Sequence, residues 1–125
     1  MEVKSYETVF IITPVLPDEQ VKDTVDKFKK IITDQGGKIV HEEFWGLKKL
    51  AYPIKKKNTG FYALFEFKTN PENILNMDIE YRRDERVMRH LVVSLDKYGV
   101  AYNEKRRNKQ AEQALESPIE DEEQN

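Results

Sequence analysis

The alternation of apolar and polar residues predicts a strand and then a helix in the first third of the chain. Residues 6–13 form a nearly continuous β-branched and aromatic run, which is typical of a central strand buried on both faces. Pro17 followed by Asp18 suits a helix start, because proline fits the first turn and an acid faces the positive end of the helix dipole. We expect the helix to end at Gly36 and Gly37. Its apolar stripe is formed by Val21, Val25, Phe28 and Ile32.

A long β-hairpin is predicted in the middle of the chain. Residues 38–54 are rich in aromatic and β-branched residues and lack helical periodicity, and Gly46 within them indicates a bulge. Residues 60–67 form the returning strand, with the turn residues Asn58 and Gly60 placed between the two runs. The tip of this hairpin is cationic, because it carries Lys55, Lys56 and Lys57.

The remaining pattern predicts a second helix, a last strand and a tail. Asn70 and Pro71 suit the start of a helix that continues to about Arg82. Residues 87–95 read as a strand, and from residue 104 the composition is of low complexity, with four closing acids. We therefore expect a folded domain at residues 1–98 and a flexible charged tail at residues 99–125.

The order of these elements is β, α, β, β, α, β. Right-handed crossovers in each half place both helices on one face of a four-stranded antiparallel sheet, which is the α+β ferredoxin-like sandwich. The other sheet face is left without helices, and it is expected to carry Val9, Ile11, Tyr62 and Leu64. Because such a surface is more apolar than solvent contact requires, we expect a protein partner or RNA bases on it.

Composition and charge narrow the class of protein. The chain has 125 residues, no cysteine, no apolar run long enough to cross a membrane and no signal peptide, so we expect a cytoplasmic protein of one domain. The net charge is −2, but it is unevenly distributed. Residues 103–125 carry four basic against seven acidic residues, which leaves the rest of the chain with a net charge of +1. The basic residues in that part are concentrated in two clusters, one in the hairpin and one at the end of the second helix.

The hairpin and the end of the second helix resemble a known family. The run from Trp45 to Ile54 (WGLKKLAYPI), the opening Tyr6-Glu7 and the stretch from Arg83 to Arg89 (RDERVMR) are similar to bacterial small-subunit ribosomal protein six. The resemblance implies a ferredoxin-like fold, no enzymatic activity and no cofactor. It also implies a place on the platform of the small ribosomal subunit. There the family binds the central domain of small-subunit ribosomal RNA jointly with ribosomal protein eighteen.

The two basic clusters are the candidate RNA contacts, because side chains that neutralise phosphates release condensed counterions. The alternative is that they are ordinary solubilising charges, and Arg86 and Arg89 could instead pair with Asp84, Glu85 or Glu66. The candidate RNA-binding residues of the first cluster are Lys48, Lys49, Lys55, Lys56 and Lys57, and those of the second cluster are Arg82, Arg83, Arg86 and Arg89. Amphipathic aromatic rings are favoured at protein interfaces. The candidate partner-binding residues are Trp45, Tyr52, Tyr62 and Leu64.

The aromatic residues and the histidines of the sheet allow two other interpretations. Phe10, Phe61 and Phe65 invite comparison with the RNA-recognition motif, but their spacing matches it only in part, so we expect them to pack in the core. His41 and His90 lie in different strands and no glycine-rich phosphate loop is present, so no catalytic or metal site is expected, and no small-molecule substrate. The alternative function is a stand-alone ferredoxin-like module that binds a ligand or hydrolyses phosphoryl compounds.

Overall fold

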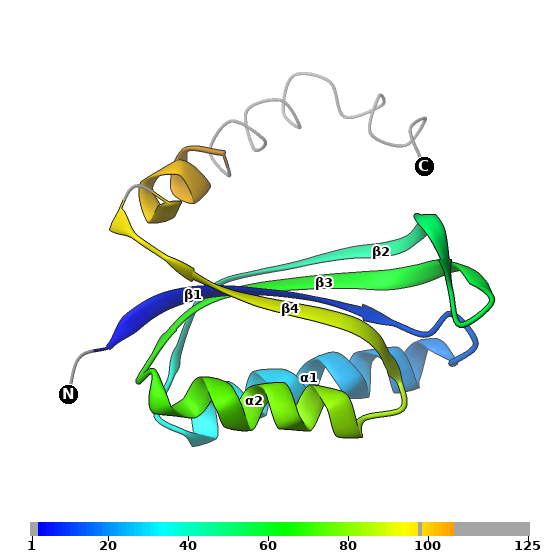
Figure 1. The fold of residues 1–125 in the computed structure, drawn as a ribbon, viewed down its shortest axis with the longest axis horizontal. Helices are drawn as coiled ribbons and strands as arrows, with labels where there is room; N and C mark the ends of the chain where they lie inside the picture. Colours follow the sequence, from blue (N-terminus) through cyan, green and yellow to red (C-terminus); the bar gives the residue numbers. More distant parts are fainter. Residues whose placement is uncertain (1–2, 98, 107–125) are drawn as a thin grey trace. The chain divides into compact units, whose positions relative to one another are not determined.

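The computed structural model describes residues 3–97 and 99–106, and Figure 1 shows a four-stranded sheet with two helices on one side of it. The strands pair in the order β2-β3-β1-β4, antiparallel, which confirms the predicted ferredoxin-like sandwich. The edges of the sheet are therefore β2 and β4. Along the chain, the elements are β1 (Lys4–Ile12), α1 (Asp18–Asp34), β2 (Lys38–Ile54), β3 (Lys57–Thr69), α2 (Glu72–Arg83) and β4 (Val87–Leu95).

The chain divides into two compact units, Met1–Ser94 and Leu95–Asn125. In the second unit residues 99–106 are helical, and Asp96 caps this segment by accepting a hydrogen bond of 2.7 Å from the backbone N–H of Gly99. The expected tail at residues 99–125 is thus helical over its first eight residues, while residues 107–125 lie outside the described part of the chain. Among the described residues, no helix has the length and apolar character needed to span a membrane.

Both helices begin and end as their sequences predict. Pro17 precedes α1, and the chain leaves this helix through Gly36, whose φ of 81° suits glycine, while Gly37 N–H bonds to the carbonyl of Ile32. At α2 the side chain of Asn70 accepts a hydrogen bond of 3.1 Å from the backbone N–H of Glu72. A proline before α1 and an asparagine cap before α2 therefore mark the two helix starts.

The core lies between the helices and the facing side of the sheet. Phe10 at its centre has no exposed surface and packs against Phe28, Phe65 and Tyr81, with ring centroids 5.2–5.7 Å apart. The Tyr81 hydroxyl lies 2.9 Å from the hydroxyl of Thr8, and burial raises the pKa of Tyr81 well above its usual value of 10. Phe10 and Phe65 are core residues, as expected, and are unavailable for stacking on RNA bases.

The strand register assigns each residue to a face of the sheet. Phe10 pairs with Ala63 on the helix side, so the neighbouring pair Ile11 and Tyr62 lies on the face opposite the helices, which we call the open face. Phe44 pairs with Ala63 and Gly46 pairs with Tyr62, so Trp45 is an extra residue in β2 and forms the predicted bulge. Gly46 has a φ of 73°. Trp45 consequently reaches the open face and stacks on Tyr62, with ring centroids 6.0 Å apart.

The hairpin turn differs from the sequence prediction. Ile54 pairs with Lys57, so the turn consists of Lys55 and Lys56, whose φ angles of 49° and 66° both lie in the left-handed region. Two such residues make the type I′ geometry, and each non-glycine residue there costs about 1 kcal/mol. Gly60 instead lies within β3, where an added Cβ would collide with Cγ2 of Ile11. Glycine is needed at this position for close packing. Gly60, and Asn58 with it, was therefore wrongly interpreted as a turn residue.

The hairpin also contains an irregular segment that we call the strap, residues 50–53. Five residue steps separate Lys49 from Ile54 on β2, but only two separate their partners Thr59 and Lys57 on β3, so β2 has three extra residues. Leu50 is buried against the open face near Ile11 and Gly60. The strap thus covers the hairpin end of the open face and leaves a hollow of about 220 Å³ beside it.

Candidate nucleic-acid and protein interface

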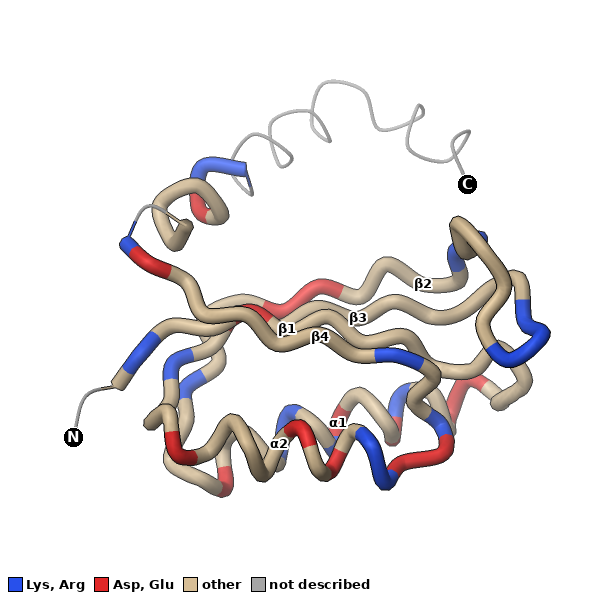
Figure 2. Tube along the Cα trace, viewed as in Figure 1, with Lys and Arg blue, Asp and Glu red and all other residues tan. Residues whose placement is uncertain are grey.

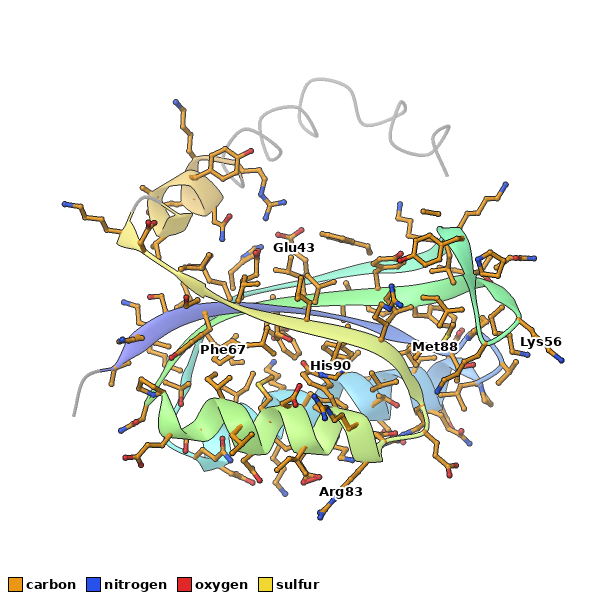
Figure 3. The ribbon with its side chains drawn as sticks, viewed as in Figure 1. Glu43, Lys56, Phe67, Arg83, Met88 and His90 are labelled. Atoms are coloured by element: carbon orange, nitrogen blue, oxygen red, sulfur yellow. The ribbon has the colours of Figure 1, made fainter. Side chains whose placement is uncertain are left out.

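The hairpin is a continuous stretch of positive charge. No acidic residue occurs between Glu43 and Glu66, whereas five lysines do: Lys48, Lys49, Lys55, Lys56 and Lys57. Figure 2 shows the lysines of the turn at the outer end of the β2–β3 hairpin, and Lys56 points away from the protein in Figure 3. Lys55 and Lys56 are exposed, and Lys57 is half-buried. Within the described residues no carboxylate lies within ion-pair distance of these three ammonium groups.

Lys48 and Lys49 extend this positive surface along the hairpin. They pair with Gly60 and Thr59 of β3, so their side chains leave opposite faces of the hairpin close to its tip. Lys49 is exposed and Lys48 already interacts with another residue. The structure therefore brings the five predicted lysines together on one element.

The arginines of the second cluster are mostly engaged within the protein. Arg82 pairs with Asp78 one helical turn earlier, with 3.0 Å between Nε and Oδ2. Asp78 also lies 2.6 Å from Nε2 of His90, and this hydrogen bond lowers the pKa of the Asp78 carboxyl. Arg83, by contrast, is exposed and extends from the end of α2, away from the sheet (Figure 3). It is the arginine of the cluster with the most freedom to contact a phosphate.

Arg86 and Lys27, both half-buried, pair with the buried carboxylate of Asp84. The Asp84 carboxylate accepts hydrogen bonds from the backbone N–H, Nε and Nη2 of Arg86, at 2.9, 2.9 and 2.7 Å, and one of 2.9 Å from Lys27 on α1. The Arg86 hydrogen bonds, followed by that of Lys27, hold the pKa of Asp84 far below its usual 3.8 despite the opposing effect of burial. Arg86 therefore ties the α2–β4 turn to α1, the pairing that was the alternative to RNA contact.

Arg89 reaches across the open face to the strap. It lies on the edge strand β4, and its Nη1 donates a 2.7 Å hydrogen bond to the hydroxyl of Tyr52. Its guanidinium also lies over the Tyr52 ring, 5.6 Å from the centroid. Since Tyr52 belongs to β2 at the opposite edge of the sheet, this contact clasps the strap to the far side of the sheet.

The open face differs from the hairpin tip in charge. Glu7 pairs with Glu66 across β1 and β3, and Glu43 lies on the same face, opposite the helices (Figure 3). Trp45 donates a 2.8 Å hydrogen bond from Nε1 to Oε1 of Glu43, and its ring remains 40% exposed. Of the predicted partner-binding residues, Trp45 and Tyr62 form one stacked pair on this face. Leu64 is only 4% exposed, so it offers little surface to a partner.

A second apolar surface was missed by the sequence analysis. Phe44 and Leu47 are 53% and 55% exposed at the outer edge strand, and Phe44 stacks on Phe61 with ring centroids 6.2 Å apart. A cleft of about 390 Å³ lies between these rings and α1, lined by Val21, Val25, Asp18 and Lys22 as well. The bulge at Gly46 places both Phe44 and Leu47 on the helix side of the sheet. Allowing for one extra residue at the predicted bulge would have assigned Phe44 and Leu47 to the helix side from the sequence alone.

Both histidines contact neighbouring side chains of the sheet and helices. Nε2 of His41 lies 3.0 Å from Oε2 of Glu43, and His90 stacks on Tyr81. Across residues 3–97 and 99–106, no three histidine or acidic side chains are grouped so that they could hold a metal ion.

The sequence and the structure of the chain are similar to those of one family of proteins. The model of the family described as ribosomal protein S6 matches residues 5–94. The small ribosomal subunit protein bS6 of Phocaeicola vulgatus is 58% identical over 106 residues, covering 85% of this chain and 93% of that protein. That of Parabacteroides distasonis is 56% identical, covering 85% and 90%. The crystal structure of 30S ribosomal protein S6 from Thermotoga maritima superposes with a TM-score of 0.74 at 32% identity, over 87% of this chain and 99% of that one.

These relatives are structural proteins of the ribosome rather than enzymes. The match covers both helices and all of the sheet except its first and last residues, Lys4 and Leu95, and so includes the lysine-bearing hairpin and the α2–β4 turn. The chain therefore belongs to the ribosomal protein S6 family and is a protein of the small ribosomal subunit.

Proposed function

We propose that this protein binds the central domain of small-subunit ribosomal RNA jointly with ribosomal protein eighteen, and that it thereby supports assembly of the platform in the cytoplasm. The observation that carries the RNA part is the acid-free hairpin with its five lysines. Phosphate contacts of this kind supply affinity and orientation without reading sequence. Specificity then comes from the folded shape of the RNA and from the partner.

The proposed division of labour follows the charges. The lysines of the hairpin, with Arg83 in addition, contact phosphates, whereas the half-buried Glu7 and Glu43 place negative charge on the middle of the open face and disfavour RNA there. Those carboxylates suit a basic protein instead, and the stacked pair of Trp45 and Tyr62 offers the amphipathic rings that interfaces favour. Ribosomal protein eighteen is therefore assigned to the open face.

The test is a pair of binding measurements with the full chain. An RNA containing the central-domain junction is titrated with the protein, with and without ribosomal protein eighteen, at several salt concentrations. We expect weak binding alone, because the net charge of the protein outside residues 103–125 is only +1, and much tighter binding with the partner. Equal affinity in both titrations would contradict joint binding, and failure to co-sediment with small ribosomal subunits would contradict the function as a whole.

Two sets of variants separate the surfaces. Reversing the charge of Lys55, Lys56 and Lys57 to glutamate should weaken RNA binding and flatten the slope of log affinity against log salt. Trp45→Ala should leave binding by the protein alone unchanged and reduce the gain that the partner provides. The stand-alone enzyme alternative would instead be favoured by turnover of an acyl phosphate.

A further inference from the structure

The hairpin turn is made of residues that the turn itself disfavours. Both positions of a type I′ turn require positive φ, and asparagine, aspartate and glycine are the residues that tolerate it. Here Lys55 and Lys56 hold φ angles of 49° and 66°, while Asn58 and Gly60 lie nearby in β3. The turn thus carries avoidable backbone strain at the most exposed part of the hairpin.

The register of the sheet explains why the turn falls at this position but not why lysines occupy it. Phe61, Ala63 and Phe65 must face the helices, and Gly60 must lie against Ile11, so the two turn positions are fixed by the core. The side chains at those positions contact nothing that the core depends on, since both are exposed. Nothing in the core therefore requires lysines there, and the pair present adds two positive charges instead of relieving the strain.

We infer that Lys55 and Lys56 are a phosphate-binding pair, retained in a strained left-handed turn because they take up neighbouring phosphate groups of the RNA backbone. This inference rests on the proposed function and deepens it by assigning the central contact to two residues. A two-residue turn holds its ends rigidly through the flanking pair Ile54 and Lys57, so the two ammonium groups are presented from a fixed backbone. The two lysines add positive charge at the tip but make the turn less stable than asparagine or glycine would.

Three double variants separate charge from backbone geometry. K55N/K56G removes both charges and relieves the strain, K55Q/K56Q removes the charges and keeps the strain, and K55R/K56R keeps both. A matched control, K30Q/K38Q, removes two charges from exposed lysines on α1 and at the start of β2. Each variant is measured for its Tm and for its affinity toward the central-domain RNA in the presence of ribosomal protein eighteen.

We expect both uncharged turn variants to lose affinity, by about tenfold for each lysine at 0.1 M salt, and the salt slope to fall by about 1.8. K55N/K56G should have a higher Tm than the wild type, whereas K55Q/K56Q should not. K55R/K56R should bind as the wild type does, and K30Q/K38Q should change the affinity less than twofold.

Two results would overturn the inference while leaving the proposed function in place: wild-type affinity and salt slope in both uncharged variants, or no rise in Tm for K55N/K56G. A wild-type protein that does not bind the RNA even with its partner would overturn the proposed function, and the inference with it.

Discussion

The two basic clusters of this protein look alike in the sequence but differ in the structure. The lysines of the hairpin tip have no carboxylate among their neighbours in sequence; Lys55 and Lys56 are exposed, and Lys56 points away from the protein (Figure 3). The arginines around the α2–β4 turn are interleaved with acids, and Arg82, Arg86 and Arg89 contact Asp78, Asp84 and Tyr52 respectively. One cluster is available to a polyanion, and the other largely holds the fold together.

The difference shows that a count of charges does not identify a binding surface. What matters is whether each cation has a local anion within reach, because a buried pair is strongly coupled whereas an exposed unpaired lysine keeps its full capacity for phosphate. Arg83 is the exception in its cluster and groups with the lysines by this criterion.

The largest expected effect comes from removing the acid that organises the structural cluster. Asp84→Asn should lower the free energy of unfolding by about 3 kcal/mol, because Arg86 and Lys27 lose a buried common partner. Urea denaturation followed by circular dichroism measures the change. A loss below ~0.5 kcal/mol would mean that Asp84 contributes no more than a surface charge. The matched control is Glu85→Gln, at an exposed position next to Asp84.

Acid should weaken the same cluster without any mutation. The pKa of Asp84 is lowered in the folded protein, so its contribution to stability is complete above the usual pKa of 3.8 and is lost as the pH falls through the lower folded value. Asp78 acts in the same direction. We expect the free energy of unfolding to decrease by up to about 1.4 kcal/mol per pH unit for each group below that pKa. Asp84→Asn should flatten this dependence, measured by denaturation between pH 5 and 2.

Arg86→Gln should give a smaller loss of stability, about 2 kcal/mol, because Lys27 and the backbone N–H of residue 86 still bind Asp84. Its effect on RNA should be small: the salt slope of binding, measured where the variant is folded, should match the wild type. A slope reduced by about 1 would place Arg86 among the phosphate contacts instead.

The clasp between Arg89 and Tyr52 should be weaker still. Tyr52→Phe removes the hydroxyl, Arg89→Lys keeps the charge but loses the planar guanidinium, and the double variant closes a thermodynamic cycle. We expect a coupling energy of about 0.5–1 kcal/mol in stability. Additive losses would show that the two side chains do not interact in solution.

The smallest effect on stability is expected at two cations that form no ion pair with the other described residues, the half-buried Lys57 and the exposed Arg83. Lys57→Gln and Arg83→Gln should each change the free energy of unfolding by less than ~0.5 kcal/mol, while lowering RNA affinity and reducing the salt slope by about 1. This is the reverse of the result expected for Arg86→Gln. Identical behaviour of all three variants would remove the distinction between the clusters.

Most of the fold follows from local signals in the sequence. The proline and asparagine at the helix starts, Gly36 after α1 and the apolar periodicities gave the order and type of all six elements, and these are confirmed. The turn was placed wrongly because Gly60 carries two possible meanings, a bend or a close approach, and only the packing of Ile11 distinguishes them. The three-residue surplus in the strap has no periodic signature.

The site was predictable only to the level of candidates. Composition placed the lysines at a hairpin tip, but the pairing of Arg86 with Asp84 and the clasp of Arg89 to Tyr52 depend on tertiary geometry. The second of these joins opposite edges of the sheet, 37 positions apart in sequence. Phe44 and Leu47 were missed because the bulge at Gly46 breaks the alternation that assigns faces.

The strap adds three residues to β2 that have no partner on β3. Because its extra residues are looped out of the ladder, residues could be gained or lost there while the pairing on either side stays in place. The length of the hairpin near its cationic tip can therefore change without shifting the register of the strands that carry the aromatic core.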